Sequence, residues 1–299
     1  MQRSNYLLAG VFSLLFPLQA LAHGEELELQ WQLEGFKGPE SVVYDAGRDI
    51  LFVSNVNGEP NEKNAAGFIS TVSVDGELQE LEWLTGLNAP KGLAVHGDKL
   101  YVADIDALVE IDIPTATISN HYVVDDAQFL NDVAAADNGH IFVTDMVMNR
   151  IHVYADGEFV IWIEDPVLEN PNGVYVQDNR LVVGAWGVMT DGFATETPGH
   201  LKAVSIPDGE ITSIGSGEPI GNLDGVEADL DGDFYVTDWM AGKLLHIEPD
   251  GHVEVLLQLN QGMADLGYIQ ARDLLLLPMM QDGKLFAYHA HASAAIHED

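Results

Sequence analysis

The sequence contains no cysteine and very little positive charge. Its 299 residues include 12 Lys and Arg against 48 Asp and Glu, which gives a formal net charge of −36. The absence of cysteine excludes disulfides, thiolate catalysis and cysteine-based zinc sites. The shortage of positive charge argues against nucleic-acid binding, because phosphate groups would be repelled. We therefore expect no nucleic-acid partner; the expectation of a small-molecule substrate comes from the residues described below. The sequence indicates no particular oligomeric state.

Long apolar runs are missing after the N-terminus. The first residues, MQRSNYLLAGVFSLLFPLQALAH, contain one Arg, an apolar run and the small-residue pattern Ala20-Leu21-Ala22. This order is typical of a secretory signal peptide. We expect residues 1–22 to be removed, 23–299 to form one domain with a terminal tail from about 289 to 299, and the protein to be periplasmic or secreted. No later segment is apolar enough to span a bilayer, so membrane insertion is not expected.

Sustained helical periodicity is absent as well, and one unit repeats six times at spacings of 40 to 52 residues instead. Each copy contains two short β runs joined by a Gly, Asp or Asn turn, then a third and often a fourth run. Four strands per repeat are typical of a propeller blade, so the sequence predicts an all-β, six-bladed β-propeller. The last copy lacks an outer strand. We expect the alternating segment 26–36 to supply it.

The six repeats share the same order of strand and turn residues, but the polar residue at one position differs from repeat to repeat. The segments FLNDVAAADNGHIFVTD (129–145) and NLDGVEADLDGDFYVTD (222–238) illustrate this. In a propeller, the innermost strands begin at one mouth of the central channel, so these polar side chains should meet there. A single such residue would be ascribed to turn capping, but six in register favour a site. The six positions are Glu40, Lys91, Asn131, Asn172, Asp224 and Asp265.

Three of these residues have the chemistry of a metal site. Glu40, Asn172 and Asp224 offer only carboxylate and amide oxygens. Such hard donors favour Ca²⁺, with Mg²⁺, Mn²⁺ and Zn²⁺ as alternatives. Without a cation, converging carboxylates would repel one another and raise their pKa values. A divalent cation is therefore the predicted cofactor.

The sequence also resembles the gluconolactonase, luciferin-regenerating-enzyme and regucalcin (senescence marker protein) family. The similar stretches are GPESVVYD, FLNDVAAADNG, NPNGVYVQDNRLVV and LDGVEADLDGDFYVTD, and the resemblance extends over about residues 26–288. It implies that Glu40, Asn172 and Asp224 bind the cation, that Asn131 contacts the substrate and that Asp224 is also the general base.

One position departs from the family pattern. Sugar lactonases of the family often carry Arg two residues before the substrate-contacting Asn, and this chain has Phe129 there. Lys91 could supply the missing positive charge, and Asp265 of the sixth repeat is a further candidate contact to the substrate. This departure leaves the substrate open.

Aromatic and thioether side chains are expected beside the polar ring. Trp186 and Trp239 each follow the second strand of a blade, with Met146 and Met279 at matching places. They could contact a substrate or pack between blades, and the sequence does not choose. The longer segments 55–67 and 187–199 are predicted to cover the mouth.

Other motifs carry less weight. DLDGD, Asp229 to Asp233, resembles a calcium loop but lacks the terminal Glu, so we interpret it as a hairpin turn. His23 and the C-terminal histidines 289, 291 and 297 offer metal-ligand chemistry whose role the sequence does not indicate.

The sequence therefore favours a metal-dependent hydrolase of small lactones or related esters. A GxSxG serine motif is absent, which fits attack by water rather than by an enzyme nucleophile. The alternative is a non-catalytic propeller that binds a ligand or a protein at the same mouth. A quinoprotein dehydrogenase is a third possibility, although the chain is short for cofactor-binding loops.

Overall fold

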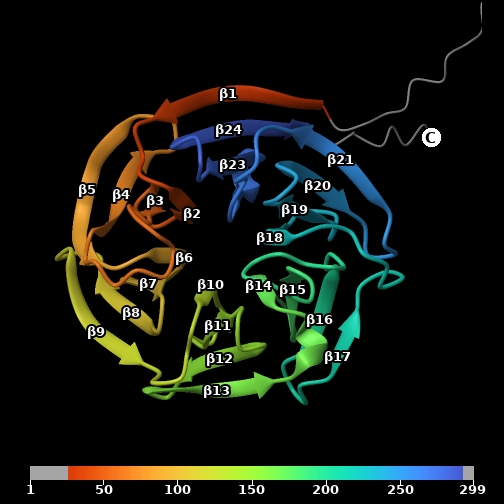
Figure 1. Cartoon of the computed structure of the whole chain (residues 1–299). Helices are drawn as coiled ribbons and strands as arrows, with labels where there is room; N and C mark the ends of the chain where they lie inside the picture. The colour runs from red at the N-terminus through yellow and green to blue at the C-terminus, as the bar shows by residue number, and fades with distance from the viewer. Residues whose placement is uncertain (1–25, 292–299) are drawn as a thin grey trace, which may run out of the picture.

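The computed structural model describes residues 26–291, which form six four-stranded antiparallel sheets around a central channel (Figure 1). The predicted all-β, six-bladed propeller is therefore confirmed. The predicted signal peptide, His23 and residues 292–299 of the predicted tail lie outside the described residues.

The first three blades follow one another along the chain, each running from an inner strand near the channel to an outer strand at the rim. The first blade contains β2 (Pro39–Asp45), β3 (Ile50–Asn55), β4 (Gly67–Ser73) and β5 (Leu78–Leu87). The second contains β6 (Pro90–His96), β7 (Lys99–Asp104), β8 (Ala107–Asp112) and β9 (Thr117–Val123). The third contains β10 (Leu130–Ala135), β11 (Ile141–Asp145), β12 (Arg150–Ala155) and β13 (Glu158–Glu164).

The other three blades complete the ring. The fourth contains β14 (Pro171–Gln177), β15 (Arg180–Ala185), β16 (Leu201–Ser205) and β17 (Ile211–Ser213). The fifth contains β18 (Leu223–Ala228), β19 (Phe234–Asp238), β20 (Lys243–Ile247) and β21 (Val253–Gln258). The sixth contains β22 (Gly267–Ile269), β23 (Leu274–Met279), β24 (Lys284–His291) and, as its outer strand, β1 (Glu26–Glu34).

Helices are minor in this part of the chain. Residues 26–291 contain two 3₁₀ turns, η1 (Pro166–Leu168) and η2 (Gln270–Arg272). Neither is long enough to cross a bilayer, so the described region contains no candidate transmembrane helix.

The N-terminal strand closes the ring, as predicted from segment 26–36. β1 pairs antiparallel with β24 from Glu26 opposite His291 to Glu34 opposite Lys284. Closure joins the two ends of the described chain and covers an edge strand that would otherwise offer unpaired backbone groups. Because β24 continues to His291, residues 289–291 belong to the last blade and not to the predicted tail.

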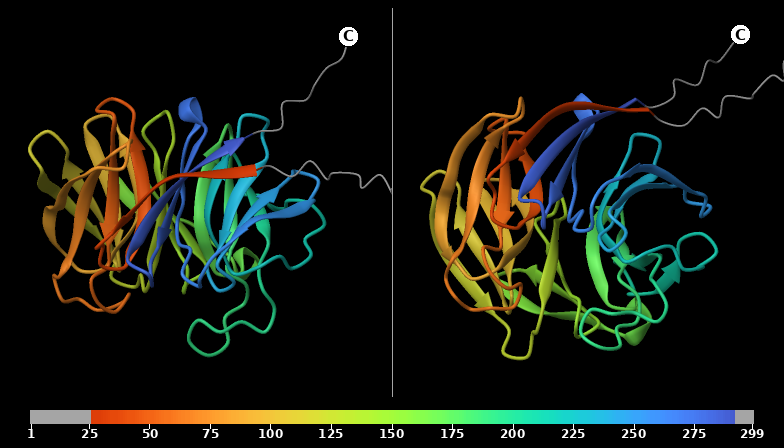
Figure 2. Two further views of the ribbon diagram at one scale, coloured as in Figure 1. Left: turned by 90° about the horizontal axis from the view of Figure 1, so that it is seen from above. Right: turned by 45° about the horizontal axis from the view of Figure 1, so that its top comes forward.

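The hydrophobic core consists of the interfaces between neighbouring blades. Phe52 and Ile69 of the first blade, for example, pack in one cluster with Leu93 and Val102 of the second. Each of the six large clusters joins two adjacent blades in this way. The ring of interfaces holds the inner strands in fixed positions around the channel. Figure 2 shows the resulting disk, with segment 187–199, green to teal, projecting from one face.

Candidate functional site

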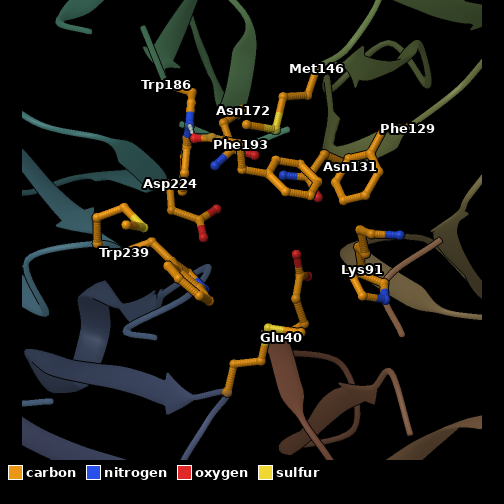
Figure 3. A pocket seen from close by; sticks show the side chains of 13 residues that line it. Glu40, Lys91, Phe129, Asn131, Met146, Asn172, Trp186, Phe193, Asp224 and Trp239 are labelled. Carbon is orange, nitrogen blue, oxygen red and sulfur yellow. Dashed lines mark hydrogen bonds between the residues drawn. The ribbon is translucent and has the colours of Figure 1, made fainter. Parts of the chain in front are cut away.

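A cavity of about 150 Å³ opens at the channel mouth (Figure 3). Five buried polar residues, one from the inner strand of each of the first five blades, form what we call the polar floor: Glu40, Lys91, Asn131, Asn172 and Asp224. Eight residues form the apolar wall: Pro60, Phe129, Met146, Trp186, Phe193, Trp239, Met240 and Met280. The structure thus brings together five of the six predicted polar residues and both predicted tryptophans.

A β-bulge turns the polar side chains toward the channel. In the first blade, Glu40 and Ser41 together face the single residue Ser54 on β3. The same two-against-one offset is present at the start of β6, β10, β14 and β18. A bulge bends its strand and re-aims its side chains. The repeated frame therefore produces the same local geometry five times, with a different polar residue in each.

Close approach of neighbouring inner strands explains the glycine that follows three floor residues, Lys91, Asn172 and Asp224. A Cβ at Gly173 would lie 1.7 Å from the Asp224 carbonyl oxygen, and a Cβ at Gly225 would lie 2.3 Å from the Leu266 backbone nitrogen. Both contacts are with backbone, which has little freedom to move aside. A larger residue at either position would push blades apart and displace Asn172 or Asp224.

The sixth blade places Ala264, and not Asp265, in register with the polar floor. Thr144 Oγ1 donates to the Asn172 carbonyl at 2.7 Å, and the equivalent Thr237 Oγ1 donates to the Ala264 carbonyl at 2.9 Å. The predicted alignment of Asp265 is therefore wrong by one residue. Its segment, MADLG, lacks the polar-Gly pair that marks the fourth and fifth blades. A shift of one residue along a strand turns the side chain to the opposite side.

Asp265 instead lies farther along the channel. Together with Asp132 and Glu227 it lines a second cavity, of about 200 Å³. Its Oδ2 accepts a hydrogen bond from Ser41 Oγ at 2.6 Å. Burial raises the pKa of Asp265 to about 7, although hydrogen bonds with Ser41 and Asp132 act in the opposite direction. The predicted substrate contact from Asp265 therefore has no support in its position.

The same one-residue shift affects the methionine predicted at the mouth. Met279 is fully buried in the core between the fifth and sixth blades, and the next residue, Met280, lines the cavity. Met146 lines the cavity as predicted.

Four buried oxygen atoms of the polar floor lack a hydrogen-bond partner among the described residues: Glu40 Oε2, Asn131 Oδ1, Asn172 Oδ1 and Asp224 Oδ1. Figure 3 shows the Glu40 and Asp224 carboxylates directed toward the centre of the cavity. A buried oxygen without a partner costs about 1–3 kcal/mol. Four such atoms in one cavity fit a bound positive group, and a donor set of oxygens alone fits Ca²⁺ best.

The raised pKa values of the floor carboxyl groups agree with a site for a positive group. Burial raises the pKa of Glu40 well above its ordinary value, the charges of Asp224 and Asp265 raise it further, and Lys91 opposes them. Burial and the charge of Asp265 likewise raise the pKa of Asp224 well above its ordinary value. The floor therefore holds excess negative charge that either protons or a cation would neutralise.

Lys91 lines the cavity, but its ammonium group already has partners. Nζ donates to the Ala89 carbonyl at 3.0 Å and lies 4.4 Å from the centroid of the Phe129 ring. Burial lowers the pKa of Lys91 to about 8, against the opposing charges of Glu40 and Asp104. A substrate contact from Lys91 would compete with these interactions.

Aromatic side chains on neighbouring elements build the apolar wall. The ring centroids of Trp186 and Trp239 lie 6.2 Å apart, at an interplanar angle of 55°. Trp186 Nε1 donates to the Phe193 carbonyl at 2.9 Å. The Phe193 ring in turn meets the Phe129 ring edge-on, with centroids 5.2 Å apart. These contacts fix segment 187–199 to the cavity wall.

Both longer segments reach the mouth, as predicted. Segment 55–67 contributes Pro60 to the wall, and segment 187–199 contributes Phe193. Sequence reasoning did not single out either residue. Phe193 is the sole aromatic residue of segment 187–199, and that was an available signal.

A second group of metal-ligand residue types lies outside the cavity. Ligand atoms of Asp229, Asp233 and His246 lie within 4.8 Å of one another. Asp229 Oδ1 accepts three backbone N–H groups, from residues 231 to 233, and its Oδ2 lies 3.1 Å from His246 Nε2. The segment connects β18 to β19, so the hairpin interpretation of DLDGD is confirmed.

Comparisons with known proteins found similar structures but no similar sequences. No protein-family model matches the chain, and a search of curated proteins found no match. Many solved structures share the fold. A gluconolactonase from Xanthomonas campestris is 15% identical, with a TM-score of 0.67 over 89% of this chain and 90% of the other. A putative gluconolactonase is 17% identical, with a TM-score of 0.67 over 90% and 93%.

A second kind of propeller is also similar. Virginiamycin B lyase from Staphylococcus aureus is 15% identical, with a TM-score of 0.59 over 88% of this chain and 99% of the other. At these identities the likeness concerns the fold alone, a β-propeller, and says nothing of this chain's activity.

Proposed function

We propose that the protein is a metal-dependent hydrolase of lactones or related small esters. One observation carries this proposal: four blades direct buried, unpaired oxygen atoms into a single cavity of about 150 Å³. The structural likeness to proteins named gluconolactonases supports the choice of lactones as the substrate class. Export to the periplasm or exterior, from the predicted signal peptide, is part of the same proposal.

Three residues of the polar floor would hold the cation. Glu40, Asn172 and Asp224 supply oxygen donors from the first, fourth and fifth blades, and Ca²⁺ is the ion that such a set favours. When bound, the cation would polarise the lactone carbonyl and stabilise the oxyanion that develops on it.

Side chains of the polar floor would orient the substrate and transfer the proton. The Asn131 side chain, whose Oδ1 is unpaired, orients the substrate. Asp224 takes a proton from the attacking water, whose oxygen bonds to the carbonyl carbon. As the ring C–O bond breaks, Asp224 returns that proton to the departing ring oxygen and the product is a hydroxy acid. General base catalysis of this kind contributes about 10²- to 10⁴-fold.

A screen of metal-stripped protein tests the proposal. Ca²⁺, Mg²⁺, Mn²⁺ and Zn²⁺ are added back singly, and hydrolysis of five- and six-membered lactones is followed by acid release. Activity that appears with one cation and disappears with chelator is the expected result. Binding of lactones without turnover under all four cations would instead favour the non-catalytic propeller, which uses the same cavity.

A further inference from the structure

The apolar wall offers a ligand almost no hydrogen-bonding group. It consists chiefly of the side chains of Phe129, Met146, Trp186, Phe193 and Trp239. The indole N–H of Trp186 is occupied by the Phe193 carbonyl. Polar side chains that line the cavity are confined to the floor. A ligand therefore meets oxygen and nitrogen atoms at the floor, and at the wall it meets carbon, sulfur and the indole N–H of Trp239.

This division decides which lactones fit. A hydroxyl group pressed against Phe129, Met146 or Phe193 would lose its hydrogen bonds to water and gain none, a loss of roughly tenfold or more in affinity for each hydroxyl. An alkyl or aryl group in the same place gains, because each buried methylene contributes roughly fourfold in affinity. The wall thus disfavours a polyhydroxylated ring.

We infer that the substrate is a lactone, or another small cyclic ester, whose ring carries an alkyl or aryl group in place of hydroxyls. This inference rests on the proposed hydrolase and adds the substrate class to it. The carbonyl lies at the polar floor and the substituent lies against the apolar wall. An apolar cavity of about 150 Å³ holds one benzene-sized group, so the lactone ring fills most of this cavity and the substituent extends along the wall toward its rim.

The apolar surface continues from the cavity to solvent. Phe193 and Met240 line the cavity although they are 40% and 45% exposed. Large apolar side chains gathered at the rim of a cavity mark a surface that a ligand covers. A substituent on the lactone ring would leave the cavity along these two residues.

A substrate series measures the preference directly. Unsubstituted δ-valerolactone, its 5-methyl to 5-pentyl derivatives, a 5-phenyl derivative and D-glucono-δ-lactone share one ring size. We expect kcat/KM to rise about fourfold per methylene until the cavity is filled, with gluconolactone at or below the unsubstituted ring. Faster hydrolysis of gluconolactone than of the alkyl series would overturn the inference and leave the hydrolase intact.

Variants of Phe193 test whether the apolar wall causes the preference for alkyl and aryl lactones. Phe193→Ala should lower kcat/KM for the pentyl and phenyl lactones by about tenfold or more, mainly through KM, and should lower kcat/KM for δ-valerolactone by a much smaller factor. Phe193→Leu should restore most of the loss. Leu230→Ala is the matched control, because Leu230 is 72% exposed on the hairpin between β18 and β19 and outside the cavity. Equal losses on all substrates would contradict a specific role for Phe193.

A binding measurement keeps the inference testable without turnover. The δ-lactams, which resist hydrolysis, are titrated calorimetrically with and without a 5-pentyl group at saturating Ca²⁺. Tighter binding of the pentyl lactam, a negative heat-capacity change and loss of both in Phe193→Ala support apolar recognition. If these appear while no lactone is hydrolysed, the hydrolase proposal fails and the ligand class stands. Equal or absent binding of the two lactams would overturn the ligand class.

Discussion

Thr144 Oγ1 lies 2.7 Å from the Asn172 carbonyl oxygen and joins the third blade to the residue that heads the fourth. The same hydroxyl accepts the Asp132 backbone N–H at 2.9 Å. One side chain therefore ties together two inner strands at the point where Asn131 and Asn172 enter the polar floor. Thr237 makes the same pair of bonds in the fifth blade, but its acceptor is Ala264, which carries no polar side chain.

This pair of threonines permits a matched test. Thr144→Val and Thr237→Val each keep the side-chain shape and remove a hydroxyl with two buried partners, so each should cost about 1–3 kcal/mol of stability. Both variants should also weaken divalent-cation binding, because Thr144→Val loosens Asn172 and Thr237→Val removes the acceptor of the Gly225 backbone N–H beside Asp224. Thermal denaturation and calorimetric titration with Ca²⁺ measure the two effects. Cation affinity equal to that of the wild type in both variants would show that these threonines have no part in positioning the site.

Lys91→Met should make the fold depend more strongly on the cation. Lys91 is the positive charge that opposes the raised pKa of Glu40, and it also repels a cation bound nearby. Its removal should destabilise the cation-free protein and tighten Ca²⁺ binding severalfold. The wild type should gain about 2.7 kcal/mol at a Ca²⁺ concentration of 100 times its Kd. Melts with chelator and with Ca²⁺ should therefore differ more in the variant, and an equal difference would contradict this account.

Asp224→Asn separates cation binding from proton transfer. Asn keeps one oxygen donor but loses the negative charge and the capacity to act as a base. Cation affinity should fall modestly, while kcat should fall by about 10²- to 10⁴-fold. The measurement is kcat at saturating cation, together with calorimetric affinity. Full turnover in the variant would leave the cation site in place and transfer the role of base to another residue, of which Glu40 is the first to test.

Asp265 should contribute a pH dependence to stability. Burial raises its pKa to about 7. A carboxyl whose pKa is raised by folding stabilises the fold below its unfolded pKa of about 4, and that contribution is lost as the pH rises to about 7. Asp265→Asn resembles the protonated acid, so it should be more stable than the wild type at pH 8.

The advantage of Asp265→Asn should shrink as the pH falls toward 4. Urea denaturation at pH 8, 6 and 4.5, with chelator present, measures this trend. A stability difference that stays constant over that range would contradict the raised pKa of Asp265.

Local patterns were sufficient to predict most of the architecture. Alternating residues and Gly, Asp or Asn turns specify hairpins by short-range chemistry, and their repetition led to six blades and to closure by segment 26–36. The same frame placed Glu40, Lys91, Asn131, Asn172 and Asp224 correctly, because five copies share one bulge at the start of the inner strand.

In the sixth repeat, which matches the others least well, the alignment of the sequence was wrong by one residue. In the sixth copy the floor position is the apolar Ala264 and the next residue, Asp265, is polar, so residue type pointed to Asp265, and nothing local distinguished Met279 from Met280. The hydrogen bond from Thr237 to the Ala264 carbonyl, which crosses between blades, reveals the register. Contacts of this kind depend on how blades pack and leave no mark in a single repeat.

The sequence by itself determined the number of blades, the closing strand and the set of oxygen donors, because each follows from residue type and spacing along the chain. Only the tertiary structure decided what surrounds those donors. Lys91 is buried against Phe129. Phe193 reaches the cavity from segment 187–199, which lies far along the chain from Asn131. Both outcomes depend on which side chain fills the space between elements distant in sequence, and packing alone settles that.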